Sequence, residues 1–142
     1  MINNKLKAFS VILRASQAIQ EVNKKSVATL GLNQTEFAVL ELLYHKGDQP
    51  IQIIGKKILI SSSSITYVVD KLEKKKYIAR KACSEDRRVT YAALTNQGKT
   101  FMEQNFSKHT KKLEKIFEQL EEKDINKTIE LLKQIGYVAA EM

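Results

Sequence analysis

The stretch that decides the fold is residues 61–98, SSSSITYVVDKLEKKKYIARKACSEDRRVTYAALTNQG. In its first third, apolar residues recur at i, i+3, i+4 and i+7, the spacing of one buried helix face: Ile65, Val68, Val69 and Leu72. The opposite face would carry hydroxyl groups and a tyrosine near its start and lysines near its end: Ser63, Thr66, Tyr67, Asp70, Lys71 and Lys74. Such a face suits a helix that enters a groove of DNA by its N-terminal end.

The second part of the stretch predicts two short strands. Residues 77–83 have no helical stripe, residues 84–88 form a polar turn, and apolar and small residues alternate over 89–93. Two strands joined by a charged tip, directly after a helix, form a wing. The next helix then starts at Thr95, which can cap it.

Two helices are expected before residue 61. Asn33 and Glu36 have the spacing of a capping box, and the helix that they begin ends at a basic turn before Gly47. After Pro50, isoleucines at helical spacing predict a short helix up to Ile60. Gly55 in its interior indicates either a close backbone crossing or a weak helix. This short helix and the one after it make a helix-turn-helix.

Long helices are predicted at both ends of the chain. The first covers about residues 3–29, and two more cover about 95–119 and 125–140. The last has apolar residues over so broad a face that it needs a second surface to cover it. The expected fold class is mainly α with a small β-wing. The chain would be a single domain over 1–142, with a winged core at about 33–95 and terminal helices at about 3–29 and 96–140.

The charge is unevenly distributed. The 142 residues carry a net charge of +8, and residues 61–100 hold nine basic against four acidic residues, whereas residues 101–142 hold seven against eight. The basic excess therefore lies in the first hundred residues and is densest over 61–100, a distribution that favours a nucleic-acid partner.

Several other classes of function lack support. Cys83 is the one cysteine, which excludes an internal disulfide and fits a reducing compartment. No secretory signal or apolar run of membrane-spanning length is visible, so a cytoplasmic protein without a membrane partner is expected. The histidines have no metal-ligand spacing, and phosphate-loop and nucleophile-elbow motifs are absent. The sequence therefore predicts no enzyme, no metal and no cofactor.

These residues resemble the winged helix-turn-helix of MarR-type transcription regulators. The resemblance rests on Ile53-Ile54, Leu59-Ile60-Ser61-x-Ser63, Ile65-Thr66, Val69-Asp70-Lys71-Leu72-Glu73, Tyr77-Ile78, Arg80, Asp86-x-Arg88, Leu94-Thr95 and Gly98. It implies a homodimer with interlocked terminal helices that presents two winged domains to a pseudo-palindromic operator on double-stranded DNA. It also implies a repressor that is released by a small, often phenolic, ligand or by thiol oxidation.

The chain departs from the family pattern in two places. Redox-sensing members of the family carry a reactive cysteine early in the first helix, where this chain has none, and the end of the recognition helix also differs. Lys76 stands where the family commonly has a glycine in a left-handed conformation at the end of the recognition helix. A non-glycine residue in this conformation costs on the order of 1 kcal/mol. The sequence therefore does not decide whether this helix ends in the left-handed conformation.

The candidate DNA-binding residues lie in the helix start, the helix face and the wing. They are Ser61, Ser62, Ser63, Ser64, Thr66, Tyr67, Lys71, Lys74, Arg80, Asp86, Arg87 and Arg88. Hydroxyls serve base edges or phosphates, and arginines at a wing tip suit the minor groove. Capping serines, a solvated lysine run and internal ion pairs of the arginines are the structural alternatives. We expect Asp86 to orient Arg88.

The predicted function is a sequence-specific DNA-binding transcription regulator, a repressor released by a small ligand. One alternative is an architectural or weakly specific DNA-binding protein without an effector. Others are a thiol-based redox regulator that uses Cys83, and an interaction module or small enzyme built on residues 96–142.

Overall fold

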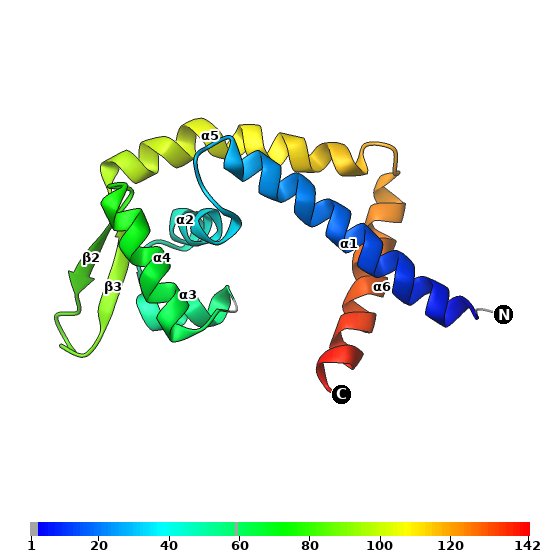
Figure 1. Cartoon of the computed structure of the whole chain (residues 1–142), viewed down its shortest axis with the longest axis horizontal. Helices are drawn as coiled ribbons and strands as arrows, with labels where there is room; N and C mark the ends of the chain where they lie inside the picture. Colours follow the sequence, from blue (N-terminus) through cyan, green and yellow to red (C-terminus); the bar gives the residue numbers. More distant parts are fainter. Residues whose placement is uncertain (1–2, 59) are drawn as a thin grey trace. The chain divides into compact units, whose positions relative to one another are not determined.

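The computed structural model describes residues 3–58 and 60–142. Leu59 of the matched motif and the side chain of Ser62 lie outside this description. The elements in chain order are α1 (Asn4–Ala28), α2 (Gln34–Lys46), β1 (Gln49–Pro50), α3 (Ile51–Lys57), α4 (Ser62–Lys74), β2 (Ile78–Ala82), β3 (Thr90–Leu94), α5 (Asn96–Glu114), the 3-10 turn η1 (Lys115–Phe117) and α6 (Glu122–Ala140). The predicted class, mainly helical with a small wing, is confirmed (Figure 1). The chain forms two compact units, one up to His109 and one from Thr110.

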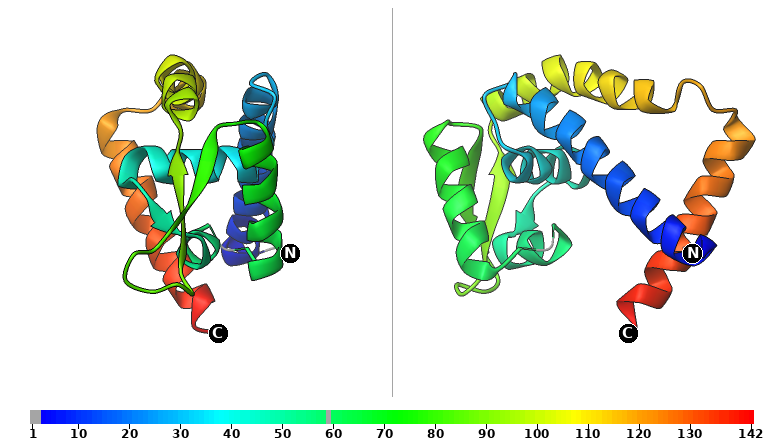
Figure 2. Two further views of the ribbon diagram at one scale, coloured as in Figure 1. Left: turned by 90° about the vertical axis from the view of Figure 1, so that its left-hand side faces the viewer. Right: turned by 45° about the vertical axis from the view of Figure 1, so that its right-hand side comes forward.

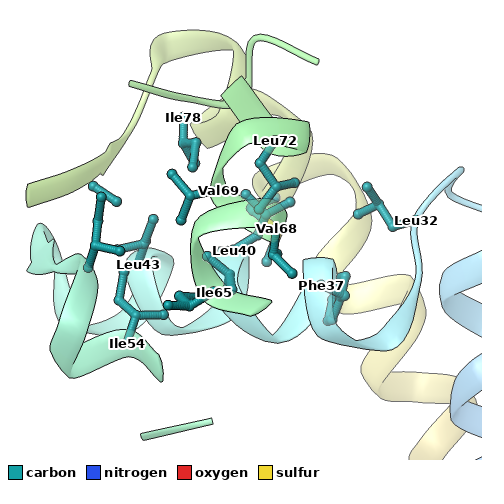
Figure 3. Packing of buried hydrophobic residues seen from close by; sticks show 14 of the residues in the cluster. Leu32, Phe37, Leu40, Leu43, Ile54, Ile65, Val68, Val69, Leu72 and Ile78 are labelled. Carbon is teal, nitrogen blue, oxygen red and sulfur yellow. The ribbon is translucent and has the colours of Figure 1, made fainter. Parts of the chain in front are cut away.

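The core of the first unit forms around the predicted stripe of α4. Ile65, Val69 and Leu72 are fully buried, and Val68 is 7% exposed. They meet apolar side chains from α2, α3 and β2, which include Leu40, Ile54 and Ile78 (Figure 3). The helical spacing in the sequence therefore identified the buried face of α4 correctly.

The helix-turn-helix consists of α3 and α4, which pack closely. A methyl group added at Gly55 of α3 would lie 3.2 Å from Cγ2 of Ile65 in α4. Of the two interpretations of this glycine, the close backbone crossing is therefore the one that the structure supports. The helix α3 ends at Lys57, earlier than the predicted end at Ile60. Ser61 caps α4 as expected, because its Oγ accepts a hydrogen bond from the backbone N–H of Ser64 at 3.3 Å.

The caps of the neighbouring helices also follow the sequence. At the start of α2, Oδ1 of Asn33 accepts from the Glu36 amide at 2.8 Å, and the Asn33 amide donates to Oε1 of Glu36 at 2.9 Å. The predicted capping box is therefore formed. Before α5, Oγ1 of Thr95 accepts from the Gly98 amide at 3.0 Å. Gly98 admits no side chain, since a Cβ there would lie 2.1 Å from the carbonyl oxygen of Tyr77.

The wing is the antiparallel pair β2–β3, which lies next to α4 (Figures 1 and 2). Its register places Ile78 opposite Leu94 and Ala82 opposite Thr90. The two-residue strand β1 pairs with the other edge of β3, which gives the strand order β1-β3-β2. The sequence did not predict β1. A proline is compatible with this position because an edge strand can do without one backbone donor.

The end of α4 is a Schellman motif with lysine in the usual place of glycine. Lys76 has φ of 68°. The Tyr77 amide donates to the carbonyl of Leu72 at 3.1 Å and the Lys76 amide to that of Glu73 at 2.9 Å. The helix exit is therefore the left-handed one, despite a conformational cost of about 1 kcal/mol for a non-glycine residue.

The second unit contains the end of the fifth helix and α6. The α-helix α5 ends at Glu114, five residues before the predicted end, and the chain tightens into η1. Glu121 is extended, and α6 begins at Glu122, three residues earlier than predicted. Within the described residues, no helix has the length and apolarity needed to span a membrane.

Apolar side chains remain exposed on the first and last helices. In α1 they include Leu6, Phe9 and Leu13, each more than half exposed. In α6 no residue is buried, and Ile129, Leu132 and Ile135 are 45–49% exposed. The broad uncovered apolar face that the sequence predicted for α6 is therefore present.

Candidate nucleic-acid interface

The exposed side of α4 carries two parallel rows of side chains. Helical spacing places Thr66, Asp70 and Glu73 in one row and Ser63, Tyr67, Lys71 and Lys74 in the other. We call them the wing-side row and the outer row. Thr66 lines a hollow together with residues of the wing, which shows on which side its row lies. The outer row is exposed except for Lys71, which is half-buried, and it bears no carboxylate.

Tyr67 is the most prominent side chain of the outer row. It is 61% exposed. The ammonium of Lys71, one turn further on, lies 5.2 Å from the centre of its ring, within the range of a cation–π contact. This contact restrains a large aromatic side chain that has both an apolar face and a hydroxyl. The row can therefore offer stacking, hydrogen bonding and positive charge together.

The serines at the start of α4 are bound to one another. Oγ of Ser61 lies 2.9 Å from Oγ of Ser64 and 3.3 Å from Oγ of Ser63. Ser61 thus has the capping role that was its structural alternative. All three residues are exposed, so their remaining hydrogen-bond capacity faces solvent.

Arg80 on β2 does not extend freely into solvent. Its Nη2 lies 2.6 Å from Oδ1 of Asp70, and its Nη1 lies 2.5 Å from Oε1 of Glu73. The hydrogen bond with Asp70 is the largest influence that raises the pKa of Arg80, and the charge of Glu73 adds to it. The predicted DNA-contacting arginine therefore joins the wing to the wing-side row of α4.

At the wing tip, Asp86 orients Arg88 in the way the sequence led us to expect. Oδ1 of Asp86 accepts from the Arg88 amide at 3.0 Å and from its Nε at 3.2 Å. These bonds lower the pKa of Asp86, the side-chain bond being the larger cause. The Arg88 side chain nevertheless remains 90% exposed, and its neighbour Arg87 is exposed as well. The tip therefore presents two cations to solvent.

The lysines at the end of α4 have different roles. Nζ of Lys75 lies 2.9 Å from the carbonyl oxygen of Gly31 and 3.2 Å from Oε2 of the buried Glu36, which ties α4 to the start of α2. Lys74 and Lys76 are exposed. Lys74, in the outer row, remains available for a phosphate, and Lys75 serves the fold.

A hollow of about 530 Å³ lies between α3, α4 and the wing. Thr66, Arg80 and Arg88 contribute polar groups to its lining, and Cys83 lies there too. Cys83 is half-buried directly after β2. Among the described residues, no group of three or more histidine, cysteine or acidic side chains could hold a metal ion.

A buried polar contact between α1 and α5 could not be predicted from the sequence. His109 of α5 is 3% exposed, and its Nδ1 lies 2.7 Å from Oγ of Ser26 in α1. Its ring also packs on Phe37 of α2, with the ring centres 4.5 Å apart. No local motif marks His109, because its partner is 83 residues away in the sequence.

Solved structures with very different sequences share this fold. AbsC, a MarR family regulator from Streptomyces coelicolor, has a TM-score of 0.90 over 100% of this chain and 99% of its own, at 18% identity. Sco3205 from the same organism, in complex with DNA, has a TM-score of 0.86 over 96% and 89%, at 16% identity. BpsR from Bordetella bronchiseptica, whose DNA binding is regulated by 6-hydroxynicotinic acid, has a TM-score of 0.78 over 92% and 98%, at 20% identity.

Relatives by sequence are found in Bacillus subtilis (strain 168). The HTH-type transcriptional regulator MhqR is 48% identical, over 96% of this chain and 94% of its own length. The uncharacterized regulator YkoM is 34% identical over 95% and 88%, and the transcriptional repressor YetL is 27% identical over 84% and 74%. The model of the MarR family matches residues 32–90, from the start of α2 to the wing. The chain therefore belongs to the MarR family of HTH-type transcriptional regulators.

Proposed function

We propose that this chain binds a specific operator with the outer row of α4 in the major groove and the wing tip at the minor groove. The observation that carries the proposal is the division of α4. Its apolar stripe is buried, while the opposite side presents hydroxyl, aromatic and basic groups to solvent. Side chains of these kinds contact base edges and phosphates. Arginines such as Arg87 and Arg88 suit the negative potential of a narrow minor groove.

We further propose that the active form is a homodimer. The exposed apolar residues of α1 and α6 support this, because an apolar surface of this extent in a soluble protein marks an interaction site. Two copies would present two α4 helices about 34–36 Å apart, which is one turn of DNA. The operator would accordingly be pseudo-palindromic.

A repressor that a small ligand releases is the mode of action that we propose. YetL is named a repressor, and the DNA binding of BpsR is regulated by a small hydroxylated aromatic acid. As a regulator of bacterial type, the chain would act in the cytoplasm. An architectural protein is not favoured, because the relatives by sequence are named as transcriptional regulators. A redox role of Cys83 would require oxidant-dependent release, which the C83S variant would abolish.

The test is binding to the DNA upstream of the gene, which we expect to contain an inverted repeat, compared with random DNA of equal length. A sequence-specific regulator should prefer its site by at least ~10³-fold. If the dimer makes 6 to 10 phosphate contacts, the affinity should fall by about 10³ to 10⁵ between 50 and 200 mM salt. Equal affinity for both DNAs would leave the architectural alternative, and undetectable binding to either would reject the proposal.

A further inference from the structure

Two acidic side chains lie on the wing side of α4, the helix proposed to contact the operator. Asp70 and Glu73 lie one turn apart in the wing-side row, next to the face that would meet DNA. Each side chain is more than 40% exposed. Two free carboxylates at this place would repel phosphates.

Arg80 of the wing pairs with both carboxylates. One terminal nitrogen binds Asp70 and the other binds Glu73, so a single guanidinium bridges a full turn of α4. Both N–O distances are in the short range of charge-assisted bonds. The side chain of Arg80 is 29% exposed, less than either partner. Its charge is therefore already engaged within the protein.

Only a short backbone link joins α4 to β2, so contacts between the side chains of the two elements help to set the position of the wing. The connection consists of residues 75–77 and contains Lys76 in the left-handed conformation, which lysine adopts at a cost. Beyond the joint, the wing continues from β2 to the exposed tip with Arg87 and Arg88. Besides the packing of Ile78 against α4, the ion pairs of Arg80 are a further link between α4 and β2.

We propose that Arg80 is a positioning residue that acts through Asp70 and Glu73, and that it makes no contact with phosphate. The bridge holds the wing at the angle at which helix and tip read one operator together, and it screens the two carboxylates from the DNA. This inference rests on the proposed function and assigns Arg80 a role different from the DNA contact that the sequence suggested.

The two roles of Arg80 predict opposite effects of Asp70→Asn. If Arg80 contacted phosphate, loss of Asp70 would remove a negative charge near DNA and free the guanidinium, so binding would tighten. If Arg80 positions the wing, the same change opens half of the bridge, and operator affinity should fall by up to roughly fivefold. Glu85→Gln is the matched control, because it removes one exposed carboxylate from the wing turn and leaves the bridge intact. It should leave binding unchanged or tighten it.

A double-mutant cycle and the salt dependence complete the experiment. Affinities of wild type, Asp70→Asn, Arg80→Gln and the double variant are measured by fluorescence anisotropy on the upstream inverted repeat and on random DNA. A positioning role predicts that the double variant binds the operator no more weakly than Arg80→Gln alone. The preference for operator over random DNA should fall, and the slope of log affinity against log salt should be unchanged. Loss of a phosphate contact would lower that slope by about 0.9 for each contact.

The results separate failure of this inference from failure of the proposed function. A wild-type protein that binds no DNA rejects both. If the wild type binds its operator, tighter binding by Asp70→Asn, or a reduced salt slope in Arg80→Gln, overturns the positioning role alone. Thermal unfolding of each variant identifies a loss of affinity that stems from poor folding. Asp70→Asn, a substitution at an exposed position, keeps the test decisive if Arg80→Gln does not fold.

Discussion

The winged core and the last helix differ in how far their apolar side chains are buried. In α4, every member of the apolar stripe is buried, at most 7% exposed. In α6, which is equally periodic, no residue is buried, and isoleucines and leucines are nearly half exposed. The core thus completes its packing within one chain, whereas α6 has apolar surface to spare. The core therefore needs no second chain to bury its apolar residues, and the exposed apolar face of α6 supports the proposed homodimer.

The largest effect is expected from a charge placed on the apolar face of α6. Ile135 lies on the exposed apolar face of that helix, so Ile135→Glu should disrupt a homodimer interface. If each copy loses about 1.5–3 kcal/mol of apolar burial, the dimer loses roughly 3–6 kcal/mol. Sedimentation equilibrium should show monomers at micromolar concentration. Asn126→Glu, nine residues earlier and half a turn away, adds the same charge and should leave the dimer intact; equal effects of both variants would contradict an interface on this face.

A truncation in the core should act on folding and not on assembly. Leu72 is fully buried, and Leu72→Ala should reduce the free energy of unfolding by about 2–5 kcal/mol, through lost burial and the cavity left behind. Urea denaturation at two protein concentrations measures this effect. The loss should be the same at both concentrations. A loss that disappears at high concentration would place Leu72 in the assembly instead.

At the wing tip, the expected effect concerns DNA and not stability. Arg88→Ala should weaken operator binding by about 1–3 kcal/mol, with the melting temperature unchanged, because the side chain is 90% exposed. Anisotropy on the upstream inverted repeat measures the change. Lys133→Ala removes the same charge from α6, on the side of the helix that carries Asn126, and serves as the control. Unaltered affinity in Arg88→Ala would leave only the ion pair with Asp86 as the role of this arginine.

The smallest expected effect is a gain at the joint between α4 and β2. Glycine adopts the left-handed conformation of Lys76 without steric cost, so Lys76→Gly should stabilise the folded chain by up to about 1 kcal/mol. Greater freedom of glycine in the unfolded chain offsets part of this gain. Thermal unfolding measures the sum. A marked destabilisation would show that the lysine side chain stabilises the joint by contacts of its own.

Much of the winged core could be predicted from the sequence because its signals are local. The stripe of α4, the capping box at Asn33 and the caps at Ser61 and Thr95 each involve residues at most seven positions apart. The ends of α3, α5 and α6 were less well predicted, by three to five residues. In the described part of the chain, these termini lack a side-chain cap that would fix the first or last helical residue, so fraying or a 3-10 turn can shift the boundary.

The apolar helix faces, the strong caps and the charged turn between two strands could all be read from the order of residues. The pairing of Pro50 in the sheet, the ion pairs of Arg80 with two carboxylates and the contact of His109 with Ser26 depend on the folded chain. These two groups of features differ in the distance over which the interactions act. Periodicity and capping act within one or two turns of chain, whereas the partner of a charged or polar side chain is chosen by packing that brings distant segments together.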